Sequence, residues 1–174
     1  LFCDMSKSHL SVWLQPLITF ALQQGTISKE RYGKIIVQLA AYRHGHLSIT
    51  TEALLVIFAN DDTDKLIEFS TVTFFIGGKN ADIESHFNVV NTFLAILWKK
   101  SNSPIDLKTK KTTGILLENF LRVNQWAEVF VFLMYRNKGL KELRQYLLGW
   151  ADGHFLPKDK LDEAISKLSE EYGG

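Results

Sequence analysis

The sequence is poor in the features that mark secreted or membrane proteins. Its single cysteine, Cys3, cannot form an internal disulfide or build a cysteine-based zinc site. A reducing, cytoplasmic setting is therefore expected. The closest candidate for a membrane span, residues 87–98, is interrupted by Asn88, Asn91 and Thr92 and is too short to cross a bilayer, so no membrane partner is expected.

An excess of charge of one sign is also lacking. The 174 residues include 20 Lys and Arg and 19 Asp and Glu, so the chain has no broad electrostatic attraction for nucleic acid. Contact with RNA would need a local patch, and most such lysine runs are solvated loops. The one candidate patch for contacting phosphates consists of Lys99, Lys100, Lys108, Lys110 and Lys111.

Proline is scarce, with three residues in the whole chain, and this favours long helices. Two apolar stripes have helical spacing: Ile83, Phe87, Val90, Leu94 and Leu97, and then Trp126, Val129, Phe130, Leu133 and Met134. We predict a mainly α fold, a multi-helix bundle of eight to nine helices with at most one or two short strands near the N-terminus, at residues 1–3 and 46–49.

Several local signals refine this helix prediction. Ser28 is expected to cap one helix, and Thr50 or Thr51 the next. Pro16 is expected in the first turn of a helix or at a kink. Residues 71–76 are β-branched and aromatic, which alone suggests a strand, but their helical neighbours favour a helix.

No complete catalytic motif is present in the sequence. The cluster Asp61, Asp62 and Asp64 could hold Mg²⁺ or Mn²⁺, although helix capping is the favoured interpretation. His44 and His46 have no third ligand nearby, and the Gly-Gly-Lys-Asn segment at residues 77–80 lacks the spacing of a phosphate-binding loop. A plain turn is favoured there.

Residues 1–58 nevertheless resemble the closing portion of a PIN domain, a metal-dependent ribonuclease fold. Residues 1–4, Leu-Phe-Cys-Asp, resemble its late strand ending in an acidic residue, and residues 13–24 the helix that follows. Residues 25–28 and 32–39 are similar to its turn and final helix pair. Residues 42–49 and 77–86 are similar to PIN modules attached to large helical-repeat proteins of bacteria.

This resemblance implies a site in which several carboxylates bind Mg²⁺ or Mn²⁺ and activate water for attack on RNA. Only Asp4 matches a metal-binding position, and Met5 stands where many family members have a second acid. The family's first acidic strand would lie upstream of Leu1. Because the chain begins with Leu1 rather than Met, we expect it to be part of a larger protein whose remainder is its partner, and any metal to depend on upstream acidic residues.

Three interpretations follow for the function. The first is a partial PIN-like module at residues 1–58, which is either an RNA-directed nuclease or its degenerate, non-catalytic form. In this interpretation residues 59–174 are a helical extension, which includes a linker-like segment at 101–112. The second is a non-catalytic helical protein-interaction module, for which an exposed apolar stripe along 83–97 or 126–134 would mark the partner surface. The third is a nucleic-acid-binding domain that uses the lysines at 99–111.

Overall fold

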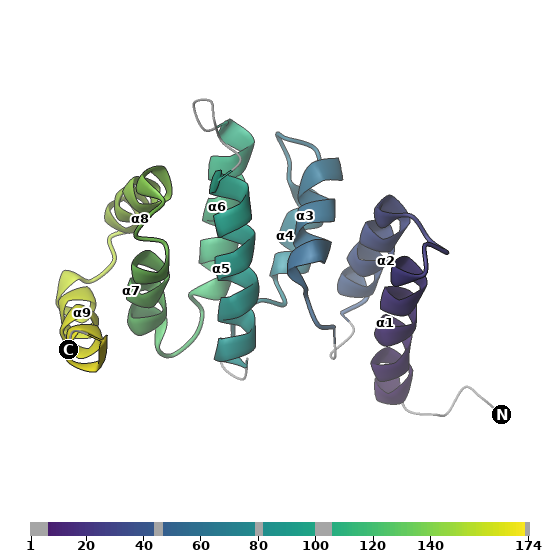
Figure 1. Cartoon of the computed structure of the whole chain (residues 1–174), viewed down its shortest axis with the longest axis horizontal. Helices are drawn as coiled ribbons and strands as arrows, with labels where there is room; N and C mark the ends of the chain where they lie inside the picture. The colour runs from purple at the N-terminus through teal and green to yellow at the C-terminus, as the bar shows by residue number, and fades with distance from the viewer. Residues whose placement is uncertain (1–6, 44–46, 79–81, 100–105, 173–174) are drawn as a thin grey trace. The chain divides into compact units, whose positions relative to one another are not determined.

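The computed structural model describes residues 7–43, 47–78, 82–99 and 106–172 (Figure 1). These residues form nine α-helices and no strand, which confirms the mainly α prediction. The strand expected at residues 1–3 lies outside the described residues, and residues 47–49 are irregular. The chain divides into two compact units, Leu1–Ile76 (unit 1) and Gly77–Gly174 (unit 2).

Unit 1 contains four helices that are centred on the second one. They are α1 (Lys7–Gln23), α2 (Lys29–Ala41), α3 (Thr51–Asn60) and α4 (Ile67–Thr73). Helix α2 packs against the other three. Its residues Tyr32 and Ile36 are buried, together with Leu54, Ile57 and Phe69 from α3 and α4. Burial of these large side chains is the main source of stability for unit 1.

Side chains cap the helices of unit 1 largely as the sequence predicts. The Ser28 hydroxyl accepts a hydrogen bond from the Arg31 amide at 3.1 Å. Of the two threonines proposed as a cap for α3, Thr50 has this role, since its hydroxyl accepts from the Ala53 amide at 3.2 Å. Pro16 lies inside α1 rather than in its first turn.

The ambiguous segment 71–76 is helical at its start and forms a turn at its end. Helix α4 includes Thr71, Val72 and Thr73, and the chain then turns through Phe74 and Phe75. The Thr73 hydroxyl donates to the Phe69 carbonyl at 2.9 Å, and the Val72 side chain is fully buried. Burial and these local hydrogen bonds therefore override the β propensity of the segment.

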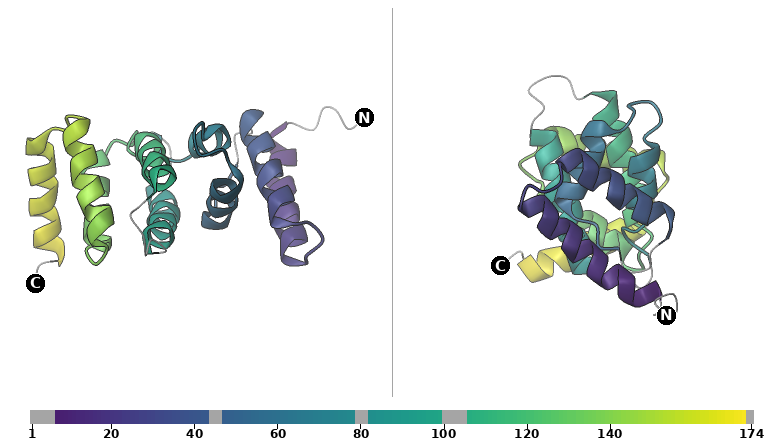
Figure 2. Two further views of the ribbon diagram at one scale, coloured as in Figure 1. Left: turned by 90° about the horizontal axis from the view of Figure 1, so that it is seen from above. Right: turned by 90° about the vertical axis from the view of Figure 1, so that its right-hand side faces the viewer.

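Unit 2 contains the other five helices: α5 (Ile83–Lys99), α6 (Leu107–Phe120), α7 (Trp126–Arg136), α8 (Lys141–Gly153) and α9 (Lys158–Tyr172). Helix α5 packs against α6 and α7, and α7 packs against α9. The left view of Figure 2 shows α9, in yellow, next to the green helices that precede it. Most of the two predicted stripes is buried in this unit, including Val90, Leu94, Phe130 and Leu133.

Two predicted boundaries differ from the observed elements. The division expected between residues 58 and 59 falls inside α3, whereas the compact units meet between Ile76 and Gly77. The last part of the segment expected to be linker-like is helical, because α6 begins at Leu107. Its N-cap is Asp106, whose carboxylate accepts a hydrogen bond from the Thr109 amide at 2.6 Å.

Candidate functional site

Unit 2 has a groove with a volume of about 640 Å³. Helix α7 forms its base, α5 flanks it on one side, and α9 flanks it on the other. We name it the α7 groove. Its apolar lining consists of Ile83, Phe87, Val129, Phe132, Ala164 and Leu168, and its polar lining of Glu84, Asn88, Glu128, Arg136, Lys167 and Glu171.

The apolar lining is a set of well-anchored side chains. Phe87, Val129 and Ala164 are buried, and Phe132 is half-buried. The Phe87 and Phe132 rings have centroids 4.9 Å apart, and the Arg136 guanidinium lies 5.9 Å from the Phe132 centroid. These contacts hold the Phe132 ring in one place at the base of the groove.

A hydrogen bond between the side chains of Asn137, which is buried, and Asn91, which is half-buried, links α7 to α5. The Asn137 side-chain amide donates to the Asn91 side-chain oxygen at 2.7 Å and to the Leu133 carbonyl at 2.9 Å. Because Phe87 meets Phe132 and Asn91 meets Asn137, α5 and α7 run in the same direction. The first turn of α5, which carries Glu84, therefore lies toward the start of α7, and Arg136 lies at the opposite end of the groove.

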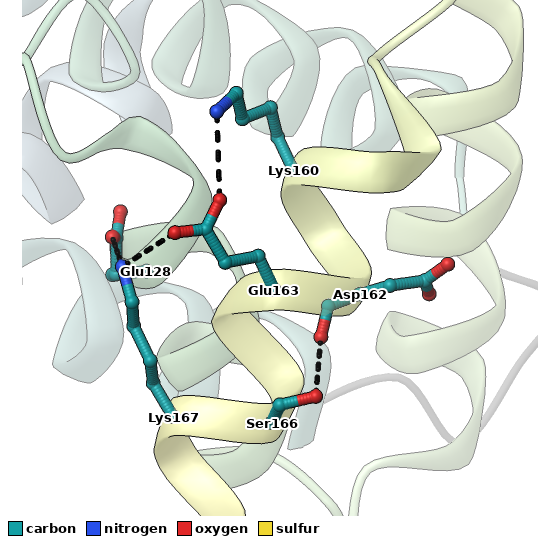
Figure 3. Close-up of polar contacts among 6 residues, drawn as sticks. All are labelled: Glu128, Lys160, Asp162, Glu163, Ser166 and Lys167. Atoms are coloured by element: carbon teal, nitrogen blue, oxygen red, sulfur yellow. Dashed lines mark hydrogen bonds and ion pairs between the residues drawn. The ribbon is translucent and has the colours of Figure 1, made fainter.

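The α9 side of the groove is held by a network of ion pairs (Figure 3). The Lys167 ammonium lies 3.0 Å from the Glu163 carboxylate and 3.3 Å from the Glu128 carboxylate of α7, and Lys160 lies 3.4 Å from Glu163. The hydrogen bond from Lys167 lowers the pKa of Glu163. The same bond raises the pKa of Lys167. These side chains are exposed, so the network positions Lys167 more than it stabilises the fold.

The charges of the rim are unevenly distributed. Lys167 is balanced by Glu128 and Glu163, whereas neither Glu84 nor Glu171 has an ion-pair partner among the described residues. Lys167 lies beside Glu128 near the start of α7, whereas Ala164, about one turn earlier in α9, packs in a cluster with Val131, further along α7. We infer that α9 runs opposite to α7, so Glu171 lies one helical turn further toward the end that carries Glu84. One end of the groove is therefore acidic, and Arg136 is at the other end.

The metal ligand predicted for the nuclease interpretation is not among the residues that the structure describes. Asp4 lies outside the described residues, as do His44 and His46. No group of three or more His, Cys, Asp or Glu residues within the described ranges could hold a metal ion. The PIN-like interpretation, with Asp4 as a metal ligand, stays a prediction.

The predicted basic patch lies at one end of the α5–α6 pair. Lys99 is the last residue of α5, whereas Lys108, Lys110 and Lys111 lie in the first turns of α6. Lys100 lies outside the described residues, and the Lys110 carbonyl accepts a hydrogen bond from the Tyr146 hydroxyl at 2.7 Å. RNA binding by these lysines stays a prediction.

Asp61 and Asp62, two of the three aspartates at 61–64, have a structural role of the kind favoured for this cluster. The Asp61 carboxylate accepts from the Phe69 amide at 2.8 Å, in the first turn of α4. The Asp62 carboxylate accepts from the Asp64 amide at 2.7 Å. These side chains therefore stabilise the turn before α4 and the start of that helix.

A turn is also observed at Gly77 and Gly78, where the sequence favours it over a phosphate-binding loop. The Gly77 amide donates to Nδ1 of His86 at 2.9 Å, and burial lowers the pKa of this histidine. Lys79 and Asn80 lie outside the described residues. His86 is thus a structural acceptor in its neutral form.

Sequence reasoning missed the α7 groove itself. Its α7 residues Glu128, Phe132 and Arg136 recur at every fourth position, and this stripe is charged at both ends. The apolar character of the groove appears only when Phe132 is placed between residues of α5 and α9. The one available signal was Phe132, an aromatic residue outside the predicted stripe.

Comparison with known proteins identifies no relative. No protein-family model, curated protein or solved structure matches the chain. No helix within the described ranges is both long enough and apolar enough to span a bilayer.

Proposed function

We propose that this chain is a helical protein-interaction module that binds an amphipathic helix of a partner protein in the α7 groove. The observation that carries the proposal is the groove's apolar base, centred on the half-buried Phe132 and bordered by charged side chains. Helix-in-groove recognition needs an apolar channel that accepts side chains from successive turns of the partner. A polar rim around an apolar centre is typical of protein interfaces.

The length of the groove supports a helical partner. Glu128 and Arg136 both line it, so it extends along about two turns of α7, or about 12 Å. On the opposite wall, Ala164 and Glu171 are separated by a similar length of α9. A partner helix with apolar residues at i, i+3 or i+4, and i+7 presents a stripe of the same length.

The test is a nuclear magnetic resonance titration of the whole chain with a synthetic amphipathic peptide. The peptide is held helical by a side-chain cross-link and carries a leucine stripe with glutamine at its polar positions, so it has no charge preference. We expect chemical-shift changes that centre on Phe87, Phe132 and Leu168. No binding, or shifts centred elsewhere, would overturn the proposal.

Two variants of α9 provide a matched comparison. Leu168→Asp places a charge in the apolar lining and should weaken peptide binding about tenfold or more, because burying one leucine side chain stabilises a complex by about 1.5–3 kcal/mol. Ile165→Asp changes a residue of the same helix that is 45% exposed and does not line the groove, so it should leave binding unchanged.

Leu168 also packs against the core cluster of α7 and α9, so its replacement also affects folding, and a second variant is needed. Asn88→Trp adds bulk at an exposed position of the rim without removing any packed side chain. It should also weaken binding, with unchanged helix content by circular dichroism. Tight binding to both folded variants would contradict the proposal.

A further inference from the structure

We infer that the partner helix is basic at one end, with Lys or Arg side chains that lie over Glu84 and Glu171. This inference rests on the proposed function and adds the chemistry and orientation of the partner. The observation that carries it is the placement of charge around the α7 groove. Three carboxylates and two cations line it, and they are not evenly spread.

The acidic end is defined by two carboxylates on opposite walls. Glu84 is in the first turn of α5 and Glu171 is near the end of α9, and both side chains are exposed. The third carboxylate, Glu128, is paired with Lys167 at 3.3 Å, so its charge is already compensated. A cation placed between Glu84 and Glu171 would find two carboxylates that have no ion-pair partner among the described residues.

The opposite end of the groove is unfavourable for a positively charged side chain of the partner. Arg136 is in the last turn of α7, and its guanidinium lies over the Phe132 ring rather than beside a carboxylate that lines the groove. A Lys or Arg of the partner at this end would meet a like charge. The two ends together therefore favour one orientation of a helix with a basic end and disfavour the reverse orientation.

The charge inference is tested with three cross-linked helical peptides that share one leucine stripe. They differ only at two positions of one terminal turn, which hold lysine, glutamine or glutamate. Dissociation constants are measured by fluorescence anisotropy with the whole chain. We expect the lysine peptide to bind about tenfold more tightly than the glutamate peptide, and the difference to shrink between about 0.05 M and 0.5 M salt because exposed charges are screened.

Two double variants with the same change in net charge show which glutamates cause the preference for the lysine peptide. Glu84→Gln with Glu171→Gln removes the acidic end, and the lysine, glutamine and glutamate peptides should then bind with similar affinity to one another. Glu142→Gln with Glu170→Gln changes the net charge equally at exposed positions that do not line the groove, and it should keep the preference.

The outcomes distinguish a failure of the inferred partner charge from a failure of the proposed function. If the glutamine peptide binds and Leu168→Asp weakens it, but the three peptides bind equally, the proposed function stands and the basic partner is wrong. If both double variants reduce the preference equally, the effect comes from net charge, and the inference is also overturned. If no peptide binds, the proposed function itself fails.

Discussion

Two adjacent threonines of α6 offer a sharp test of how unit 2 is stabilised. Thr112 and Thr113 are both fully buried. The Thr113 hydroxyl accepts a hydrogen bond from Nε1 of Trp98 at 3.0 Å and donates to the Thr109 carbonyl at 2.8 Å. The Thr112 hydroxyl has no hydrogen-bond partner within the part of the chain that the structure describes. Replacement by valine keeps the shape of either side chain and removes its hydroxyl.

The two replacements should have opposite effects. Thr113→Val leaves the buried Trp98 N–H without an acceptor, which costs about 1–3 kcal/mol. Thr112→Val removes a buried polar group that makes no bond, and it should stabilise unit 2 by up to about 1–2 kcal/mol. The helix propensities of threonine and valine are similar, so this factor contributes little to either value.

Urea unfolding followed by tryptophan fluorescence measures both effects, since three of the four tryptophans lie in unit 2. The slope of the transition should not change, while its midpoint falls for Thr113→Val and stays or rises for Thr112→Val. In a Trp98→Phe background the cost of Thr113→Val should shrink, because the orphaned donor is gone. Equal destabilisation by the two valine variants would refute the assignment of these hydrogen bonds.

Three further predictions concern the turn before α5 and the middle of α8. Gly77 has a φ of +79°, and a Cβ there would lie 2.5 Å from the Asn119 carbonyl oxygen, so Gly77→Ala should cost about 2–5 kcal/mol in urea unfolding. Gly78→Ala, at a φ of +99° with open space around it, should cost only the backbone strain, and equal costs would contradict the steric argument. Gly149→Ala, inside α8 with nothing within 4 Å of the added Cβ, should raise stability by about 0.5–1 kcal/mol, and a lower midpoint would be inconsistent with an open helix surface. Burial lowers the pKa of His86, so the unfolded chain binds its proton more readily, and this contribution to stability should be complete above about pH 6.5 and decline as the pH falls below it. His86→Gln should make the stability less dependent on pH between about 7 and 5, and an unchanged dependence would show that the imidazole does not control it.

Most of the helical architecture follows from periodicity in the sequence. The α5 stripe predicts which side of that helix is buried, and Phe87, Val90, Leu94 and Leu97 are indeed buried. Ile83, the first member of the stripe, is half-buried and lines the α7 groove. The pattern therefore identified the apolar face correctly but could not show that its first turn remains accessible, because accessibility depends on which helices pack against it.

Helix starts were predictable where a single side chain determines them. Ser28 and Thr50 accept hydrogen bonds from the amides three residues later, as their sequence context predicts. The start of α6 was not predicted, because the lysines at 108–111 and Pro104 resemble a loop in composition. Asp106 nevertheless caps this helix, and Thr109, Thr112 and Thr113 are buried on its inner face. Burial of these threonines depends on partners from another helix, such as Trp98 of α5, and the local sequence of α6 does not show them.

The composition of α7 connects the fold to the proposed partner. Residues 129–133 are consecutive apolar side chains, so this helix is apolar on every side and needs cover on every side. Phe130 and Leu133 are fully buried, and Val131 packs in a cluster with Ala164 of α9. Phe132 alone among the five residues is only half-buried, although Phe87 and Arg136 contact its ring. A partner helix in the α7 groove would bury the Phe132 side of α7, which α5 and α9 leave accessible. Leu168→Asp should therefore weaken binding of the partner helix more than Ile165→Asp does.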